Sequence, residues 1–143
     1  MKYNQLAEAA FKIFGFKVLR WPDGTRYLTR FIVFRCSRGL RYLHRIHRHD
    51  PDRHVHNHPW PAKCYVLWGG YTEVVQNRFS GYQLRRTYRR GDVNELRENE
   101  YHRIVDVLPN TWTWVVGGRR YRRWGFLVNG QPVDADVYLS RTN

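Results

Sequence analysis

Turn residues recur at short intervals from Lys17 to the end of the chain, and this spacing restricts the fold more than any other feature. Between the turns lie short runs rich in β-branched and aromatic residues, which are typical of strands. No long segment of helical period interrupts these runs, so the pattern favours an all-β architecture over alternating strands and helices. The turn signals are Pro22-Asp23-Gly24, Ser37-Arg38-Gly39, Gly69-Gly70, Asn77–Gly81, Gly91-Asp92, Pro109-Asn110, Gly117-Gly118 and Asn129-Gly130.

The runs between the turns predict about ten strands. They cover residues 17–21, 25–36, 40–47, 63–68, 71–76, 82–90, 102–108, 111–116, 121–128 and 133–139. Before them, Asn4–Phe14 has an apolar stripe at helical spacing, which Asn4 can cap and Gly15 can end. We therefore expect an all-β jelly-roll β-barrel preceded by one N-terminal helix.

The length and the cysteine content place the chain among ordinary globular proteins. At 143 residues it is long enough for one domain with a substantial core, and no linker or repeat divides it. Two cysteines, Cys36 and Cys64, make no disulfide framework, so free thiols in a cytoplasmic protein are expected. We recognise no signal peptide and no apolar run of membrane-spanning length, so no membrane partner is expected. The prediction is a single domain over residues 1–143.

Arginine dominates the charge of the sequence. The formal net charge is +13, and it comes from 21 arginines and only four lysines. Such a balance suits nucleic acid or a small anionic molecule as a partner. The arginines are spread over nearly every segment instead of forming one block, which weakens the case for nucleic acid. A coding bias that replaces surface lysine by arginine is the competing interpretation.

Histidines are concentrated in one short stretch. Six of the seven lie between His44 and His58, and His102 stands alone downstream. Residues two apart in a strand face the same side, about 6.6–7 Å apart, so His56 and His58 can converge on one metal ion together with a distant histidine. We therefore expect a mononuclear metal centre at His56, His58 and His102. The competing interpretation is a fold that keeps these histidines and binds no metal.

The stretch that begins at His56 resembles the first motif of the cupin superfamily. That motif has a His-x-His pair, a Glu three or four residues later and a Gly six residues beyond. Here His56-Asn57-His58 is the pair, and Gly69 or Gly70 takes the glycine position. The glutamate position falls on Ala62 or Lys63, so the usual carboxylate ligand is missing.

The stretch that ends at His102 resembles the second cupin motif, which opens with Gly-Asp and has a His eleven residues after that Gly. Gly91-Asp92 and His102 keep this spacing, with Arg97 and Asn99 in place of the usual Pro and Gly. Asn tolerates positive φ better than most residues, so the turn can survive the change. The resemblance implies a jelly-roll barrel with the three histidines as metal ligands.

A closer resemblance is to small, functionally uncharacterised cupin-like proteins of bacteria and phages. These carry His-x-His-Pro-Trp, Gly-Gly-Tyr-Thr-Glu, His-Arg and Arg-x-Trp-Gly-Phe elements. In this sequence the elements are His56–Trp60, Gly69–Glu73, His102-Arg103 and Arg122–Phe126. This resemblance implies a fold and a site but carries no known reaction.

A divalent metal is the cofactor that the resemblance implies. Three neutral imidazoles suit Fe(II), and they also bind Zn, Ni, Mn or Cu. Cupins that lack the glutamate and keep three histidines include thiol dioxygenases, so the resemblance implies an iron-dependent oxygenase. Glu73 follows the Gly69-Gly70 bend and is a candidate fourth ligand or general base. The alternative for Glu73 is an exposed carboxylate paired with an arginine.

Aromatic and arginine residues are candidates for a substrate pocket. Trp60 and Tyr71 are the candidates for substrate contact among seven aromatic residues that can line the interior. Arg103, Arg123 and Arg86 are candidate anchors for a small anionic substrate, because Arg binds carboxylate and phosphate through paired hydrogen bonds. The other aromatic candidates are Tyr65, Trp68, Trp112, Trp114 and Trp124.

Two kinds of function fit these features. The first is a small metal-dependent enzyme, an oxygenase by resemblance, that acts on a small anionic molecule. The second is a non-enzymatic basic barrel that binds nucleic acid, a nucleotide or a protein partner. The resemblance also implies a homodimer formed through an edge strand, for which Thr25–Cys36 is the candidate.

Overall fold

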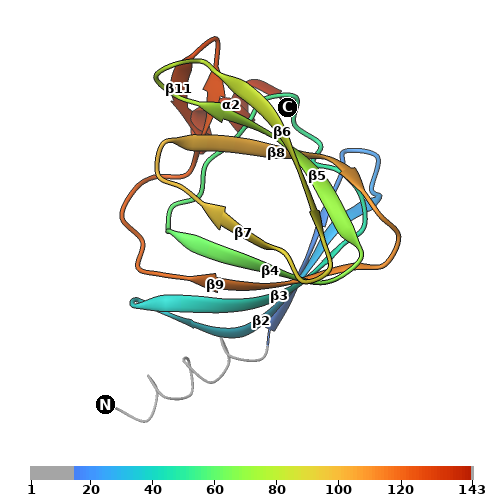
Figure 1. Ribbon diagram of the computed structural model, residues 1–143. Helices are drawn as coiled ribbons and strands as arrows, with labels where there is room; N and C mark the ends of the chain where they lie inside the picture. Colours follow the sequence, from blue (N-terminus) through green and yellow to red (C-terminus); the bar gives the residue numbers. More distant parts are fainter. Residues whose placement is uncertain (1–14, 143) are drawn as a thin grey trace.

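The computed structural model describes residues 15–142, where the chain forms strands β1–β11 and the helix α2 (Figure 1). The predicted helix over Asn4–Phe14 lies outside the described residues. Most strands occupy the predicted segments, with ends that differ by a few residues. The elements are β1 Gly15–Arg20, β2 Arg26–Cys36, β3 Gly39–Ile46, β4 Ala62–Trp68, β5 Gly70–Asn77, β6 Gln83–Arg89, β7 Val93–Leu96, β8 Glu100–Val107, β9 Thr111–Gly117, β10 Gly125–Val128, β11 Gln131–Asp134 and α2 Ala135–Thr142.

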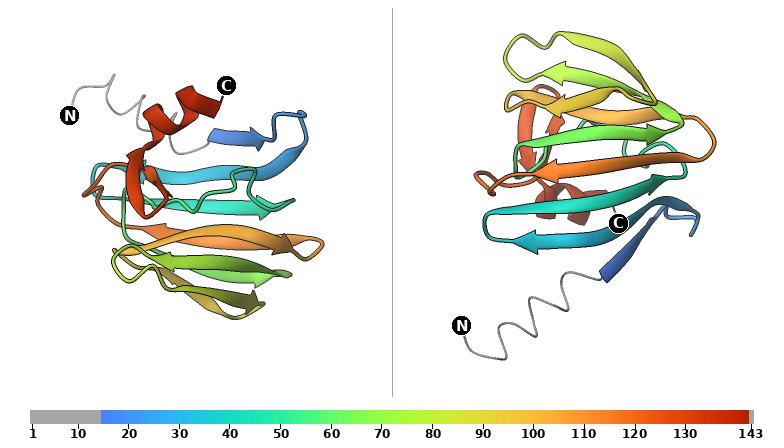
Figure 2. Two further views of the ribbon diagram at one scale, coloured as in Figure 1. Left: turned by 90° about the horizontal axis from the view of Figure 1, so that it is seen from above. Right: turned by 60° about the horizontal axis from the view of Figure 1, so that its bottom comes forward.

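Two layers of antiparallel strands make up the fold. One layer is a six-stranded sheet in the order β1-β2-β3-β9-β4-β7, and the other contains the three-stranded sheet β6-β5-β8. The β10-β11 hairpin continues the second layer, because His56 bridges both His102 in β8 and Phe126 in β10. The layers face each other in Figure 1, and Figure 2 shows α2 beside the β10-β11 hairpin. The predicted all-β jelly roll is confirmed.

Alternation along β9 determines which of its side chains fill the space between the layers. Thr111, Thr113 and Val115 are buried, and the intervening Trp112 and Trp114 lie on the opposite face of the strand. Val115 joins a core cluster with residues of β3 and β4. The interior of the six-stranded sheet is therefore built partly from threonine, not from the tryptophans of this strand.

The predicted aromatic lining is correct for Trp60 and Tyr71 and wrong for the rest. Trp60 packs against the core cluster of β3, β4 and β9, and Tyr71 is buried between the layers. The other five aromatic residues lie on outer faces or in exposed loops, because a shift of one residue in strand register exchanges the two faces. They are Tyr65, Trp68, Trp112, Trp114 and Trp124.

Two predicted turns have the backbone conformation that their residues favour. Gly69 ends β4 with a φ of +68°, and a Cβ added there would lie 2.4 Å from the Thr111 Oγ1 atom. Only glycine fits this bend without displacing β9. Asn129 and Gly130 both have positive φ in the two-residue loop of the β10-β11 hairpin, as the Asn-Gly signal indicates.

The predicted strand over Val133–Leu139 is wrong beyond Asp134, where β11 ends and α2 begins. Its sequence supports both periods, because apolar residues alternate from Val133 to Leu139 and also recur at helical spacing. In the structure Ala135 and Tyr138 are buried together against Phe126. Burial of one helical face against the hairpin therefore decides between the two periods.

Two further strands differ from expectation. The short strand β7 was not predicted, because Val93–Leu96 has four residues, two of them polar. The expectation that Thr25–Cys36 is an edge strand is wrong over Arg26–Ile32, because β1 pairs with those residues of β2. Among residues 15–142, only the end of β2 beyond Ile32 has no strand partner on that side. The homodimer itself stays a prediction.

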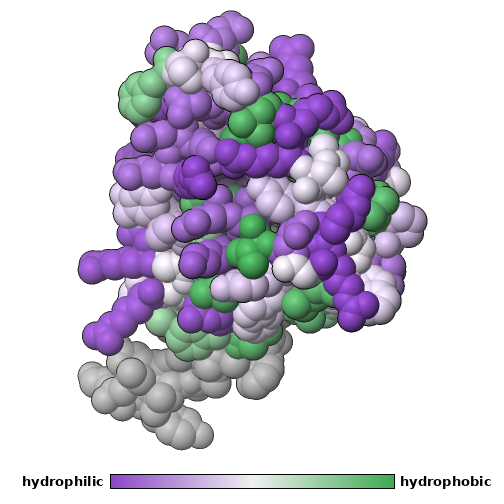
Figure 3. All heavy atoms as spheres, in the orientation of Figure 1, coloured by the Kyte–Doolittle hydropathy of each residue, from purple (hydrophilic) through white to green (hydrophobic). Residues whose placement is uncertain are grey.

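The surface is mainly hydrophilic on the side where β7 and the loop before β10 lie. Figure 3 shows this side, where hydrophilic residues predominate and hydrophobic residues lie between them, several together near the lower edge. Over residues 15–142, none of the helical structure has the length and apolar character that a membrane crossing requires.

Candidate metal centre

Backbone pairing sets His56 opposite His102. The His56 amide donates to the His102 carbonyl at 2.8 Å, and the His102 amide donates to the His56 carbonyl at 2.8 Å. Two residues that exchange both hydrogen bonds face the same side of the sheet. Their imidazole centroids are accordingly 4.9 Å apart. This pairing joins the histidine-rich stretch to β8.

His58 completes the cluster from two residues further along. Its ring centroid lies 5.3 Å from that of His56 and 5.0 Å from that of His102. The Nε2 atoms of His58 and His102 are 2.8 Å apart. Trp60 stacks on the His58 ring at 4.9 Å and limits its rotation. The structure thus brings together the three histidines that spacing and resemblance singled out.

Glu73 reaches the same cluster from β5, which pairs with β8. Its side chain is buried, and Oε2 accepts hydrogen bonds from His102 Nδ1 at 2.6 Å and from Asn94 Nδ2 at 3.1 Å. A carboxylate on Nδ1 fixes the proton there and leaves Nε2 free as a ligand atom. Glu73 is therefore not an exposed strand-end carboxylate, and it contacts the side of His102 that faces away from His58.

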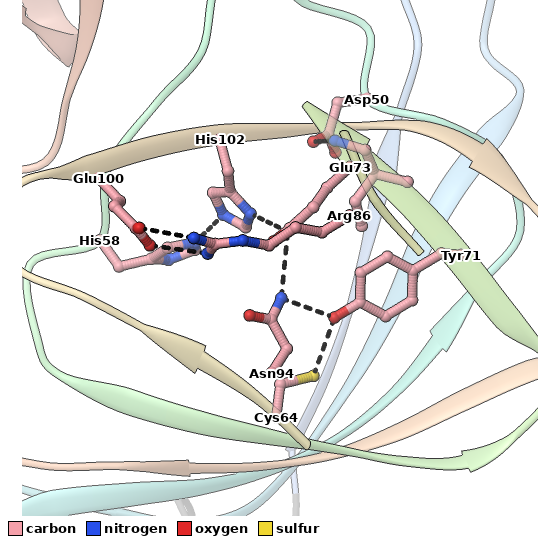
Figure 4. Close-up of polar contacts among 10 residues, drawn as sticks. Asp50, His58, Cys64, Tyr71, Glu73, Arg86, Asn94, Glu100 and His102 are labelled. Carbon is pink, nitrogen blue, oxygen red and sulfur yellow. Dashed lines mark hydrogen bonds and ion pairs between the residues drawn. The ribbon is translucent and has the colours of Figure 1, made fainter. Parts of the chain in front are cut away.

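A buried polar chain continues from Glu73 to the six-stranded sheet, as Figure 4 shows. Asn94 in β7 donates to Glu73 and also to the Tyr71 hydroxyl at 3.0 Å. The Tyr71 hydroxyl donates in turn to the Cys64 sulfur at 3.8 Å. Glu73 is thus held in place by contacts with both layers, which restricts the orientation of His102.

Burial and charge give the three histidines different proton affinities. Burial, with a smaller effect from His102, holds the pKa of His56 well below its ordinary value, and the pKa of His58 is lowered in the same way. Burial also acts to lower the pKa of His102, but the carboxylates of Glu73, Asp50 and Glu100 together outweigh it, with Glu73 the largest of them, and the pKa is raised. Two of the imidazoles are therefore neutral at pH 7, with lone pairs available to a metal.

The donor set fits a transition-metal ion. The candidate ligand atoms of His56, His58 and His102 all lie within 4.8 Å of one another. Nitrogen ligands sit about 2.0–2.1 Å from such an ion, so two of them at right angles are roughly 3 Å apart. The 2.8 Å between His58 Nε2 and His102 Nε2 is close to that value. Three imidazoles leave coordination positions open for another molecule.

Among the described residues, none of the predicted arginine anchors forms a hydrogen bond with the three histidines. Arg123 has a side chain 82% exposed and pairs with Asp134 at 3.0 Å. Arg86 makes two hydrogen bonds to Glu100, at 2.9 and 2.8 Å. Arg103 follows His102 directly in β8, so its side chain leaves the opposite face of the strand.

A small cavity of about 10 Å³ lies beside the histidines, with a volume close to that of one water molecule. Two of the polar residues that line this cavity, Asn94 and Arg122, were not candidate site residues in the sequence. Asn94 belongs to the unpredicted strand β7 and has no sequence signal, because the polar Asn94 is buried while the neighbouring apolar Val93 is exposed. Arg122 is the first residue of the Arg122–Phe126 element, and the pattern of that element does not indicate a role for this arginine. The lining residues include His58, Glu73, Asn94, Arg97, His102 and Arg122.

Comparison with known proteins gives matches among solved structures. No protein-family model matches the sequence, and no curated protein matches it. Three similar structures are Fe(II) HppE in complex with substrate, oxalate decarboxylase from Lactobacillus farciminis in a formate complex, and the polyketide cyclase RemF from Streptomyces resistomycificus. Their sequence identities are 13%, 14% and 16%, and their TM-scores are 0.56, 0.58 and 0.57.

The extent of the three matches differs. They cover 73%, 90% and 91% of this chain, and 56%, 36% and 88% of the HppE, oxalate decarboxylase and RemF chains. This chain therefore spans less than two thirds of the length of the first two. At these identities the likeness concerns the fold. The neighbours are cupin-fold proteins, and this chain has the same all-β jelly-roll fold.

Proposed function

We propose that the protein is a small metal-dependent enzyme of the cupin type, with a divalent metal held by His56, His58 and His102. The observation that carries the proposal is the convergence of three imidazoles, one of them fixed by a buried carboxylate. Among the described residues, the rings of His56 and His58 have no hydrogen-bond partner outside the cluster, and buried polar nitrogens normally have one. A metal ion supplies such a partner for all three.

Iron is the metal that we propose, and an oxygenase is the class of enzyme. The similar HppE structure contains Fe(II), and imidazole ligands suit that ion. When bound, the metal supplies Lewis-acid and redox chemistry at its open positions. Zn, Ni or Mn at the same histidines would give the metal-dependent enzyme without the redox step.

The residues around the histidines shape and tune the site. Glu73 keeps His102 in one tautomer and orientation, and through that contact it raises the basicity of the ligand nitrogen. Trp60 fixes the His58 ring by stacking, and Tyr71 fixes Asn94. The cavity is small and its rim carries arginine, so the proposed substrate is a small anion.

Metal content tests the proposal. Protein purified from iron-supplemented cells, or loaded with Fe(II) under anaerobic conditions, is expected to hold about one metal per chain by elemental analysis. The triple variant His56→Ala, His58→Ala, His102→Ala should hold none. The variant His47→Ala is the control, because this histidine lies on an exposed strand end. Metal-free wild-type protein that cannot be loaded would overturn the proposal.

Oxygen uptake tests the class of enzyme separately. Fe(II)-loaded protein is expected to consume oxygen faster with at least one member of a panel of small carboxylates and phosphates. The triple variant should show only the background rate. Stoichiometric iron binding without any such uptake would leave the metal site standing and contradict the oxygenase.

A further inference from the structure

Asn94 carries a buried amide oxygen and lines the cavity beside the histidines. Its side chain is 1% exposed, and its amide nitrogen donates to Glu73 Oε2 and to the Tyr71 hydroxyl. A carboxylate can only accept hydrogen bonds, so the NH2 group must face Glu73. The oxygen must then face the other way. Figure 4 shows it on the side of Asn94 away from Tyr71.

This oxygen has no hydrogen-bond partner among the described residues. A buried acceptor left unpaired is costly, and natural proteins almost always satisfy such groups. Asn94 lines the same small cavity as His58 and His102. A donor that completes the hydrogen bonding of Asn94 must therefore come from whatever occupies that cavity.

Arg122 provides positive charge at the rim of the same cavity. Its Nε donates to the His58 carbonyl at 2.8 Å, and its NH1 group donates to the Glu98 carbonyl. The guanidinium carbon also lies 5.0 Å from the centre of the Tyr121 ring. These contacts hold the guanidinium between the histidine-rich stretch and the turn before β8.

The charge of Arg122 is not matched by a protein carboxylate. Within residues 15–142 it forms no ion pair, in contrast to Arg86 and Arg123. Two acidic residues share the rim, but Glu100 is engaged by Arg86 and the Glu95 side chain is exposed to solvent. Two backbone carbonyls use part of the five N–H groups of an arginine and leave the rest for an anion.

We propose that this site takes a small carboxylate that also carries a hydroxyl or amino group. Arg122 binds the carboxylate at the rim, and only the hydroxyl or amino group, which is about the size of one water molecule, enters the cavity and donates a hydrogen bond to Asn94 Oδ1. The inference rests on the proposed small anionic substrate and adds its chemical class. The inference requires Arg122 and Asn94 to line the same cavity, which they do. It does not require a bound metal.

Matched acids test the role of Asn94. Lactate, alanine and propionate differ only in the group on the second carbon, and their binding is measured by calorimetry and by NMR titration. Protein treated with a chelator is used alongside metal-loaded protein, because hydroxy and amino acids also chelate metals. In both forms lactate or alanine is expected to bind at least about tenfold more tightly than propionate, since a site built for a donor rejects a ligand that lacks one.

Variants separate the two contacts. Arg122→Gln is expected to weaken all three acids about tenfold or more, and Arg119→Gln, an exposed arginine of the same loop, should weaken none. Asn94→Leu should abolish the preference for lactate over propionate in protein that retains its thermal transition. If that variant does not fold, the comparison of the three acids on the wild-type protein still decides the role of Asn94.

Three results would overturn the inference. Equal affinity for lactate and propionate in chelator-treated protein would mean that Asn94 contacts only a water molecule. Undiminished binding by Arg122→Gln would remove Arg122 from the site. The absence of binding by all three acids at millimolar concentration would rule out a site for such acids altogether. The failure of metal binding is a different result: protein that cannot be loaded with metal and still prefers lactate would contradict the proposed metal enzyme and leave this inference intact.

Discussion

Replacement of Glu73 by Gln isolates the charge of the carboxylate that holds His102. The hydrogen bonds from His102 Nδ1 and Asn94 Nδ2 both end on the single atom Oε2. A glutamine oxygen at that position can accept both, so the variant keeps the shape and the contacts and loses only the charge. The orientation of His102 should therefore survive, and the basicity of its Nε2 should fall.

The size of the effect follows from the two kinds of hydrogen bond. A bond to a charged group contributes about 1.5–3 kcal/mol, and a neutral one contributes about 0.5–1.5 kcal/mol. The difference, about 1–1.5 kcal/mol, corresponds to a roughly five- to twelvefold change in affinity. Loss of such outer partners in other metal sites costs about 10–100-fold. We therefore expect Glu73→Gln to weaken metal binding by about tenfold.

Competition against a chromophoric chelator at pH 7 measures this change. Glu98→Gln is the matched control, because the Glu98 side chain is exposed and only its backbone carbonyl contacts Arg122. The control should bind metal like the wild type, and circular dichroism should show that both variants are folded. Wild-type affinity in a folded Glu73→Gln variant would refute the role assigned to this carboxylate.

Two further predictions concern stability. Burial, with a smaller effect from Arg30, lowers the pKa of His44 to about 3. Below pH 6.5 His44 binds a proton in the unfolded chain and not in the folded chain. The free energy of unfolding therefore falls by up to about 1.4 kcal/mol for each unit by which the pH is lowered. His44→Gln should reduce this slope in urea unfolding between pH 6 and 4, and an unchanged slope would contradict the burial of a neutral His44. Gly69→Ala should lower the free energy of unfolding by about 2–5 kcal/mol, because the residue has a positive φ and the new Cβ would overlap with Thr111. Gly24→Ala has open space around a positive φ and should cost only about 1–2 kcal/mol, so equal losses of thermal stability would be inconsistent with the close approach of β9.

Local signals in the sequence were enough to predict most of the strands. Turn residues with a specific conformational role, such as Gly69 and the Asn129-Gly130 pair, mark boundaries that the structure keeps. A segment whose apolar residues fit both strand and helix spacing could not be assigned from the sequence, as α2 shows. Its conformation depends on burial of Ala135 and Tyr138 against Phe126 of the hairpin. The four-residue strand β7 is too short to have a clear period.

The candidate site was predictable to the extent that it depends on spacing. His56 and His58 share a face because they are two residues apart, and His102 could be added through the spacing of a known motif. The sequence left open whether Glu73 points inward, and in the structure alternation along β5 buries it together with Tyr71 and Val75. Arg122 could not be found, because its place depends on a loop that packs against the His58 carbonyl.

Anomalous diffraction from crystals of metal-loaded protein tests the central claim most directly. Data collected above and below the absorption edge of the bound metal locate the ion without assumptions about its ligands. One strong peak is expected about 2.0–2.2 Å from a nitrogen of each of His56, His58 and His102. No peak, or a peak at other histidines such as His47 or His49 instead, would contradict that claim.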